Sequence, residues 1–264
     1  MPTLSLMQTA PGVAVATVLF VLLILMYLAG RKVRSVQIAR DPAFGESNLS
    51  AVNGTLLGIL GLLLAFAFSM SNSRFDSRRE LIVKEANAIG TVVLRTEAFP
   101  DSIRRELRED LRLYVESRID YFATGMDVAA ILGTMKRSDS LSKMIWKKVM
   151  SYTRTPAYES KVLTSEIIPA LNDMIDIVTT RRSAGEATIP DSIMYFLLLL
   201  CLTSAFLLGY DHQGPLNWVI IGGFAFMLSV TVLMIIDLDR PRSGLIRMDS
   251  TNQRIVDLRG LFNQ

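Results

Sequence analysis

The chain has 264 residues, of which 50% are hydrophobic and 20% are charged. Its mean hydropathy of +0.36 is high for a wholly water-soluble protein, while the charged fraction is too large for a chain that lies entirely in a bilayer. The net charge of +3 suits anionic lipid headgroups and gives no indication of a nucleic-acid partner. The composition therefore predicts a membrane part and a separate aqueous part.

Four uninterrupted apolar runs predict four transmembrane helices, which the chain arranges as two pairs. The runs cover residues 13–29, 56–70, 193–208 and 218–236. With flanking small residues each run reaches the roughly 20 residues that are needed to cross about 30 Å of hydrocarbon. None of them contains a charged side chain, so each can insert readily. We therefore expect an integral membrane protein whose partners include the lipid bilayer.

Charged residues concentrate between the two pairs of spans and after the last span. Between the pairs, apolar residues recur at helical spacing and no run alternates as a strand does, which predicts an all-α fold. The predicted organisation is a first transmembrane pair at 1–71, a helical aqueous domain at 72–189, a second transmembrane pair at 190–236 and a polar tail at 237–264.

Small residues follow one stripe of the second predicted span, and they fall at helical spacing. They are Gly54, Gly58, Gly61, Ala65 and Ser69. Such a stripe permits close helix packing because the absent side chains let two backbones approach, and the Gly54-x-x-x-Gly58 pair is a common example. The alternative is that the stripe faces an axial conduit in an oligomer.

The second span passes without a helix breaker into a cluster of arginines, namely Arg74, Arg78 and Arg79. An anion pathway needs hydrogen-bond donors or positive potential without tight binding, and Ser69, Asn72, Arg74 and Arg78 are suited to supply them at a pore mouth. The three arginines are equally suited to contact lipid phosphates, as basic residues commonly do at the end of a span. The sequence leaves both roles open.

The sequence predicts no catalytic residues, no metal site and no cofactor, and hence no enzyme. The only histidine, His212, lies in a short link between the last two spans with one acidic neighbour, which is too little for a metal site or a catalytic triad. No phosphate-binding loop, dinucleotide fingerprint or zinc-protease motif is present.

Four stretches resemble the bestrophin-like family of bacterial and plant membrane proteins, and the resemblance extends over nearly the whole chain. They are residues 54–58, 65–70, 85–91 and 238–247. The wider resemblance is to bestrophin anion channels, which share the two pairs of spans with a helical domain between them. This resemblance implies a homo-oligomer, a pentamer in those channels, with inorganic ions as its permeating partners.

In bestrophins the second span lines the pore, so the resemblance would place Leu57, Leu60, Leu64 and Phe68, or the glycine stripe, at a constriction. The tryptophan-rich cluster of those channels is replaced here by Ser77-Arg78-Arg79-Glu80, and no acidic run like their calcium-binding segment follows the fourth span. The resemblance therefore implies a pore without implying calcium gating.

An even number of spans places both termini and the aqueous domain on one side of the membrane. The count of basic residues near span ends favours a cytoplasmic position for the aqueous domain, and so does the resemblance to bestrophins. The membrane is predicted to be a bacterial inner membrane. Arg31, Lys32 and Arg34 after the first span favour the opposite orientation.

The leading functional hypothesis is an oligomeric anion channel or channel-derived pore that is lined by the second span. The alternative is a non-conducting membrane sensor or scaffold whose helical domain binds a partner or ligand.

Overall fold

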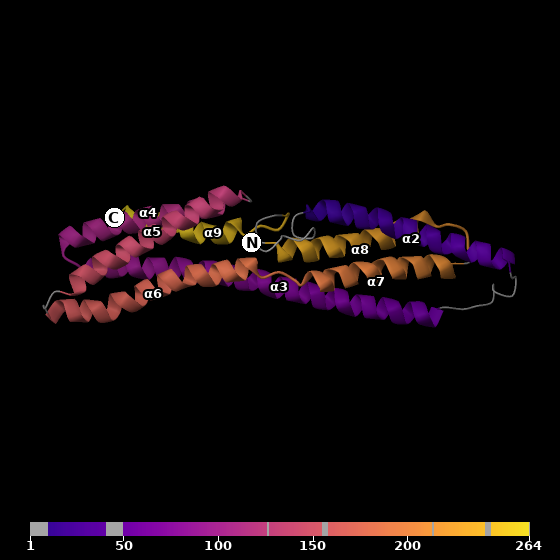
Figure 1. The fold of residues 1–264 in the computed structure, drawn as a ribbon, viewed down its shortest axis with the longest axis horizontal. Helices are drawn as coiled ribbons and strands as arrows, with labels where there is room; N and C mark the ends of the chain where they lie inside the picture. The colour runs from indigo at the N-terminus through magenta and orange to yellow at the C-terminus, as the bar shows by residue number, and fades with distance from the viewer. Residues whose placement is uncertain are drawn as a thin grey trace. The chain divides into compact units, whose positions relative to one another are not determined.

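The computed structural model describes residues 10–40, 50–125, 127–154, 158–212, 214–240 and 244–263, without the side chains of residues 153 and 158–163. These residues are almost wholly helical, and no strand occurs among them (Figure 1). The predicted all-α class is confirmed.

Eight α-helices are assigned in the described residues, and two short 3-10 helices, η2 and η3, follow α3 and α9. Their bounds are α2 (Gly12–Arg40), α3 (Ser50–Arg95), η2 (Thr96–Ala98), α4 (Asp101–Ala123), α5 (Val128–Thr153), α6 (Tyr158–Glu186), α7 (Asp191–Asp211), α8 (Trp218–Asp239), α9 (Asp249–Val256) and η3 (Asp257–Phe262).

The chain divides into two compact units. One unit, here called the membrane unit, is Met1–Arg74 with Thr188–Arg240, and the other, here called the polar unit, is Phe75–Ala187 with Pro241–Gln264. Helix α3 contributes residues to both units. Among the described residues four helical stretches are long and apolar enough to cross a membrane, so the prediction of an integral membrane protein is confirmed.

The core of the membrane unit forms where α2 packs against both α7 and α8. Leu23 of α2, Cys201 of α7 and Val232 of α8 are each at most 1% exposed within it. α3 adds Leu60 and Ala67 to the same core. The spans therefore share one apolar cluster, while their outer faces keep the exposed apolar side chains that a lipid environment accepts.

Two glycines set the close approach of α2 and α7. A Cβ at Gly30 would overlap the carbonyl oxygen of Phe206, and a Cβ at Gly209 would overlap the carbonyl oxygen of Tyr27. Both obstacles are backbone atoms, which cannot rotate away as a side chain can. The contact is reciprocal, so this pair of spans packs backbone to backbone in the way that small residues permit.

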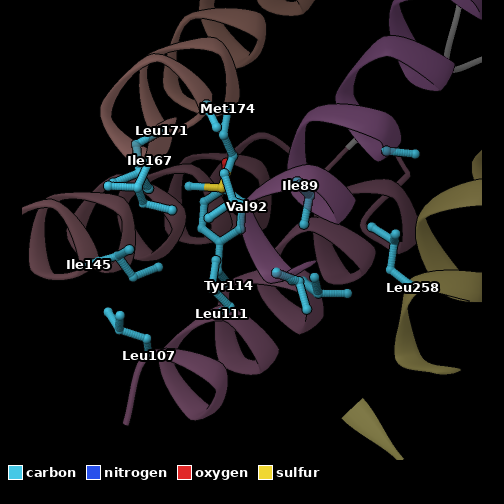
Figure 2. Close-up of a cluster of buried hydrophobic side chains, with 14 of the residues drawn as sticks. Ile89, Val92, Leu107, Leu111, Tyr114, Ile145, Ile167, Leu171, Met174 and Leu258 are labelled. Atoms are coloured by element: carbon cyan, nitrogen blue, oxygen red, sulfur yellow. The ribbon is translucent and has the colours of Figure 1, made fainter. Parts of the chain in front are cut away.

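The polar unit encloses a second apolar core, part of which is shown in Figure 2. Side chains from α3, α4, α5 and α6 meet there, including Ile89, Leu111, Ile145 and Leu171. The tail, predicted to be polar, contributes to this core through α9 and η3, since Ile255 and Leu258 are buried in it.

Candidate functional site

The small-residue stripe of α3 faces away from the other described helices of the membrane unit. No described atom outside the helix lies within 4 Å of a Cβ built on Gly54, Gly58 or Gly61. The remaining members of the predicted set are exposed as well: Ala65, Phe68, Ser69 and Asn72. The packing alternative for this stripe therefore cannot be met by the other described helices of the same chain, and it would require a second copy or another partner.

A different face of α3 packs within the chain. Asn53, Leu60, Ala67 and Ser71 are buried along it at intervals of four or seven residues. Leu60 is 2% exposed in the core of the membrane unit, so the suggestion that it forms a pore constriction is wrong for this chain. α3 thus has one face directed to its own unit and one open face.

Arg74 lies near the end of the membrane unit and pairs with Asp239. Its Nη1 is 3.5 Å from the Asp239 carboxylate, which also accepts the backbone N–H of Ile189 at 3.1 and 2.9 Å. Asp239 is 9% exposed, so both contacts are largely shielded from water. This carboxylate joins the end of α8 to the segment before α7 and to α3.

The other two predicted arginines lie in the polar unit. Arg78 is 5% exposed, and its guanidinium donates to the carbonyl oxygens of Ala184 at 3.0 Å and Ala187 at 2.6 Å, where α6 ends. Arg79 is more exposed and donates to Thr251 Oγ1 at 3.4 Å. Arg78 therefore satisfies carbonyls at a helix C-terminus, a contact that its predicted roles did not include.

A buried ionic cluster occupies the interior of the polar unit. Glu85 of α3 is fully buried, and its carboxylate accepts hydrogen bonds from Arg118 of α4 at 2.5 and 3.3 Å and from Arg181 of α6. Burial raises the pKa of Glu85, but the two guanidinium charges and their hydrogen bonds outweigh it and hold the pKa below its ordinary value. Three helices are thereby connected through one carboxylate.

Aromatic rings cover the two guanidinium groups of this cluster. The Arg118 guanidinium carbon is 4.7 Å from the centroid of the Tyr121 ring, and that of Arg181 is 4.4 Å from the centroid of the Phe122 ring. Cation–π contacts of this kind stabilise cations that have lost their hydration. Tyr114 lies close by, and burial raises the pKa of its hydroxyl well above the ordinary value.

A cavity of about 410 Å³ lies beside this cluster within the polar unit. Arg78 and Arg181 line it together with Tyr121, Phe122 and residues of the tail. The structure thus brings one predicted residue, Arg78, to a cavity that the sequence did not indicate. Among the described residues no group of three or more His, Cys, Asp or Glu side chains is arranged to hold a metal ion.

Comparison with known proteins identifies the family. The family model of the bestrophin-like domain matches residues 15–252. A single-substitution variant of a bacterial bestrophin homologue from Klebsiella pneumoniae has a similar fold, with a TM-score of 0.72 and 13% identity over 97% of this chain and 99% of that one.

A second structure of the Klebsiella pneumoniae homologue gives a TM-score of 0.69 at 14% identity, covering 94% of this chain and 98% of that one. No curated protein sequence matches the chain. At these identities the structures show the shared fold, while the family model spans most of the sequence. The chain therefore belongs to the bestrophin-like family.

Proposed function

We propose that the protein is an oligomeric ion channel in which α3 of each subunit lines a shared pathway for inorganic anions. The observation that carries this proposal is the open face of α3, where Gly54, Gly58 and Gly61 have no described neighbour outside the helix within 4 Å of a Cβ position. Faces of small residues favour helix association in membranes, and homo-oligomers close most simply by rotational symmetry. Five copies, as the resemblance to bestrophins implies, would place five such faces around one axis.

The side chains on this face suit weak interaction with anions. Phe68 is 44% exposed and supplies an apolar surface that can gate by excluding water. Ser69 and Asn72 follow it with hydroxyl and amide donors, which can replace part of an anion's hydration. A continuous row of fixed charges is absent from this face between Gly54 and Asn72, so an ion that enters can also leave.

We further propose that the polar unit lies in the cytoplasm of a bacterial cell, with α2, residues 50–74 of α3, α7 and α8 in the inner membrane. The basic residues that follow the first span favour the opposite orientation. One of them, Arg34, is 4% exposed, donates to Tyr210 O at 3.0 Å and lies 3.9 Å from the Asp211 carboxylate. A cation that is buried in its own protein contributes less to headgroup attraction than an exposed one.

Flux measured in liposomes tests the channel proposal. Purified protein is reconstituted, and chloride and potassium flux are measured for the unchanged chain and for Gly61→Trp. The matched control is Gly223→Trp in α8, a glycine in a different span that also has no described atom outside the helix within 4 Å of its Cβ position.

We expect the unchanged protein to conduct chloride. The Gly61→Trp variant should show no chloride flux, and the Gly223→Trp variant should show the same flux as the unchanged protein. Full flux through Gly61→Trp would show that the pathway does not follow α3. Absence of flux in the unchanged protein at every voltage, pH and calcium concentration tested would favour the non-conducting sensor or scaffold.

A further inference from the structure

The cavity of the polar unit has the size and construction of a small-molecule site. Its volume of about 410 Å³ lies within the range of roughly 300–1,000 Å³ that is typical of ligand pockets. Its walls come from α3, the end of α4 with the loop after it, α6 and the tail, all within one unit. The residues that matter for its chemistry are Arg78, Phe122, Arg181, Arg247, Met248 and Asn252.

The charge of the lining is strongly positive. Three arginines face one acidic residue, Asp249, which leaves a formal excess of two positive charges on the wall. Arg181 also shares the Glu85 carboxylate with Arg118, so the buried cluster beside the cavity holds two cations against one anion. A recessed surface with a net positive charge raises the local concentration of anionic ligands.

Two of the three guanidinium groups are held in place before any ligand arrives. Arg78 is fixed by two backbone carbonyls, and Arg181 is fixed by Glu85 and by the Phe122 ring. A guanidinium has five N–H donors in a rigid plane, so one fixed side chain can donate to several acceptors at once. Fixed donors reduce the entropy that a ligand must lose on binding.

The rest of the wall combines apolar surface with an unsatisfied polar atom. Ile82, Phe122 and Met248 provide the apolar part. The buried Asn252 Oδ1 has no hydrogen-bond partner among the described residues, although buried polar atoms in proteins almost always have one. A hydroxylated organic body with an anionic head therefore fits this wall better than a bare inorganic ion.

We propose that this cavity binds the phosphate group of a small hydroxylated phosphate monoester. A monoester carries about two negative charges near neutral pH, which matches the excess positive charge of the cavity wall. Its oxygens can each accept a hydrogen bond from the parallel N–H groups of an arginine side chain. The same group occurs in a soluble ester such as glycerol 3-phosphate and in the headgroup of phosphatidic acid. Its lining lies wholly in the polar unit, whereas the residues of α3 that we propose to line the ion pathway, Gly54 to Asn72, lie in the membrane unit.

Isothermal titration calorimetry on the detergent-solubilised full chain tests the proposal with glycerol 3-phosphate, with glycerol as the uncharged control. The test variant is Arg247→Gln, because Arg247 is exposed and its removal leaves the buried cluster and the core untouched. The matched control is Arg254→Gln, an exposed arginine of the same tail that does not line the cavity. Folding of each variant is checked by circular dichroism and by its thermal unfolding.

We expect saturable binding of glycerol 3-phosphate, no binding of glycerol, and a dissociation constant that rises at least tenfold in Arg247→Gln while Arg254→Gln stays within twofold. Binding of phosphatidic acid in mixed micelles without binding of glycerol 3-phosphate, again weakened by Arg247→Gln, would assign the same site to a lipid headgroup. Failure of both ligands to bind, or equal affinity in Arg247→Gln, would overturn the proposal.

Discussion

Replacement of Glu85 by glutamine should destabilise the protein far more than the same replacement at Glu80, which lies five residues earlier on α3. Glu85 is fully buried and is the shared acceptor for Arg118 and Arg181. Glu80 is exposed and, within the described part of the chain, pairs with Lys84 at 2.8 Å, one turn away on the same helix. The two variants change the same chemical group on the same helix, so the comparison isolates the surroundings of the carboxylate.

The expected losses of folding free energy in the two variants differ by about an order of magnitude. Removal of one member of a buried ion pair costs about 3–5 kcal/mol because a charge is left buried without compensation. Here two guanidinium groups lose their carboxylate, although the amide oxygen of glutamine can still accept one hydrogen bond, so we expect about 3 kcal/mol. An exposed pair one helical turn apart contributes about 0.3–0.5 kcal/mol. For a protein of this size about 1 kcal/mol corresponds to a shift of about 2–4 °C in Tm.

Thermal unfolding of the detergent-solubilised full chain provides the assay. We expect Glu85→Gln to lower Tm by about 6–12 °C and Glu80→Gln by less than about 2 °C. Addition of Arg118→Met to Glu85→Gln should recover part of the loss, since it removes one of the uncompensated charges. Equal Tm values for Glu85→Gln and the unchanged chain would refute the reasoning, because the carboxylate would then contribute nothing net.

Three further outcomes are expected from full-chain variants in the same assay. Gly30→Val should lower Tm sharply because its side chain would meet the backbone of α7. Gly223→Val should change Tm little, because no described atom outside α8 lies within 4 Å of its Cβ position. Equal effects of the two variants would contradict the close contact of α2 and α7. Asp239→Asn should lower Tm because Arg74 loses the negative charge that it faces. Adding Arg74→Met to this variant should lower Tm little further. Additive losses of Tm would show that the two side chains do not interact. Since the pKa of Glu85 is lowered in the folded protein, its stabilising effect is present above the ordinary pKa of 4.5 and is lost as the pH falls through the depressed value. Tm of the unchanged chain should therefore fall more on acidification below 4.5 than Tm of Glu85→Gln, and parallel pH profiles would contradict this.

The spans and the helical class were predictable because each depends on local composition and periodicity. An apolar run free of charge has few alternatives to a membrane helix. Part of the buried cluster was also visible in the pattern, since Arg118 falls on the same helical stripe as Leu111 and Tyr114. A charge on an apolar stripe indicates a buried partner, but the sequence does not say which acidic residue supplies it.

Features that depend on tertiary pairing were not predictable. Gly30 and Gly209 are separated by most of the chain, and only the packed helices reveal that each lies against the backbone of the other's helix. The carbonyls that hold Arg78 come from the end of α6, where any residue type would present the same atoms. The placement of Leu60 at a constriction was wrong because a resemblance cannot tell which face of α3 packs within the chain.

The most direct test of an ion pathway along α3 is modification of an introduced cysteine during flux. The single native cysteine, Cys201, is buried in α7, so a charged thiol reagent should react only at the new site. We predict that the reagent blocks chloride flux through Gly61→Cys and leaves flux through Gly223→Cys unchanged. Persistent flux in Gly61→Cys, after mass spectrometry shows complete modification, would contradict the account, and so would failure of the reagent to reach that cysteine from water.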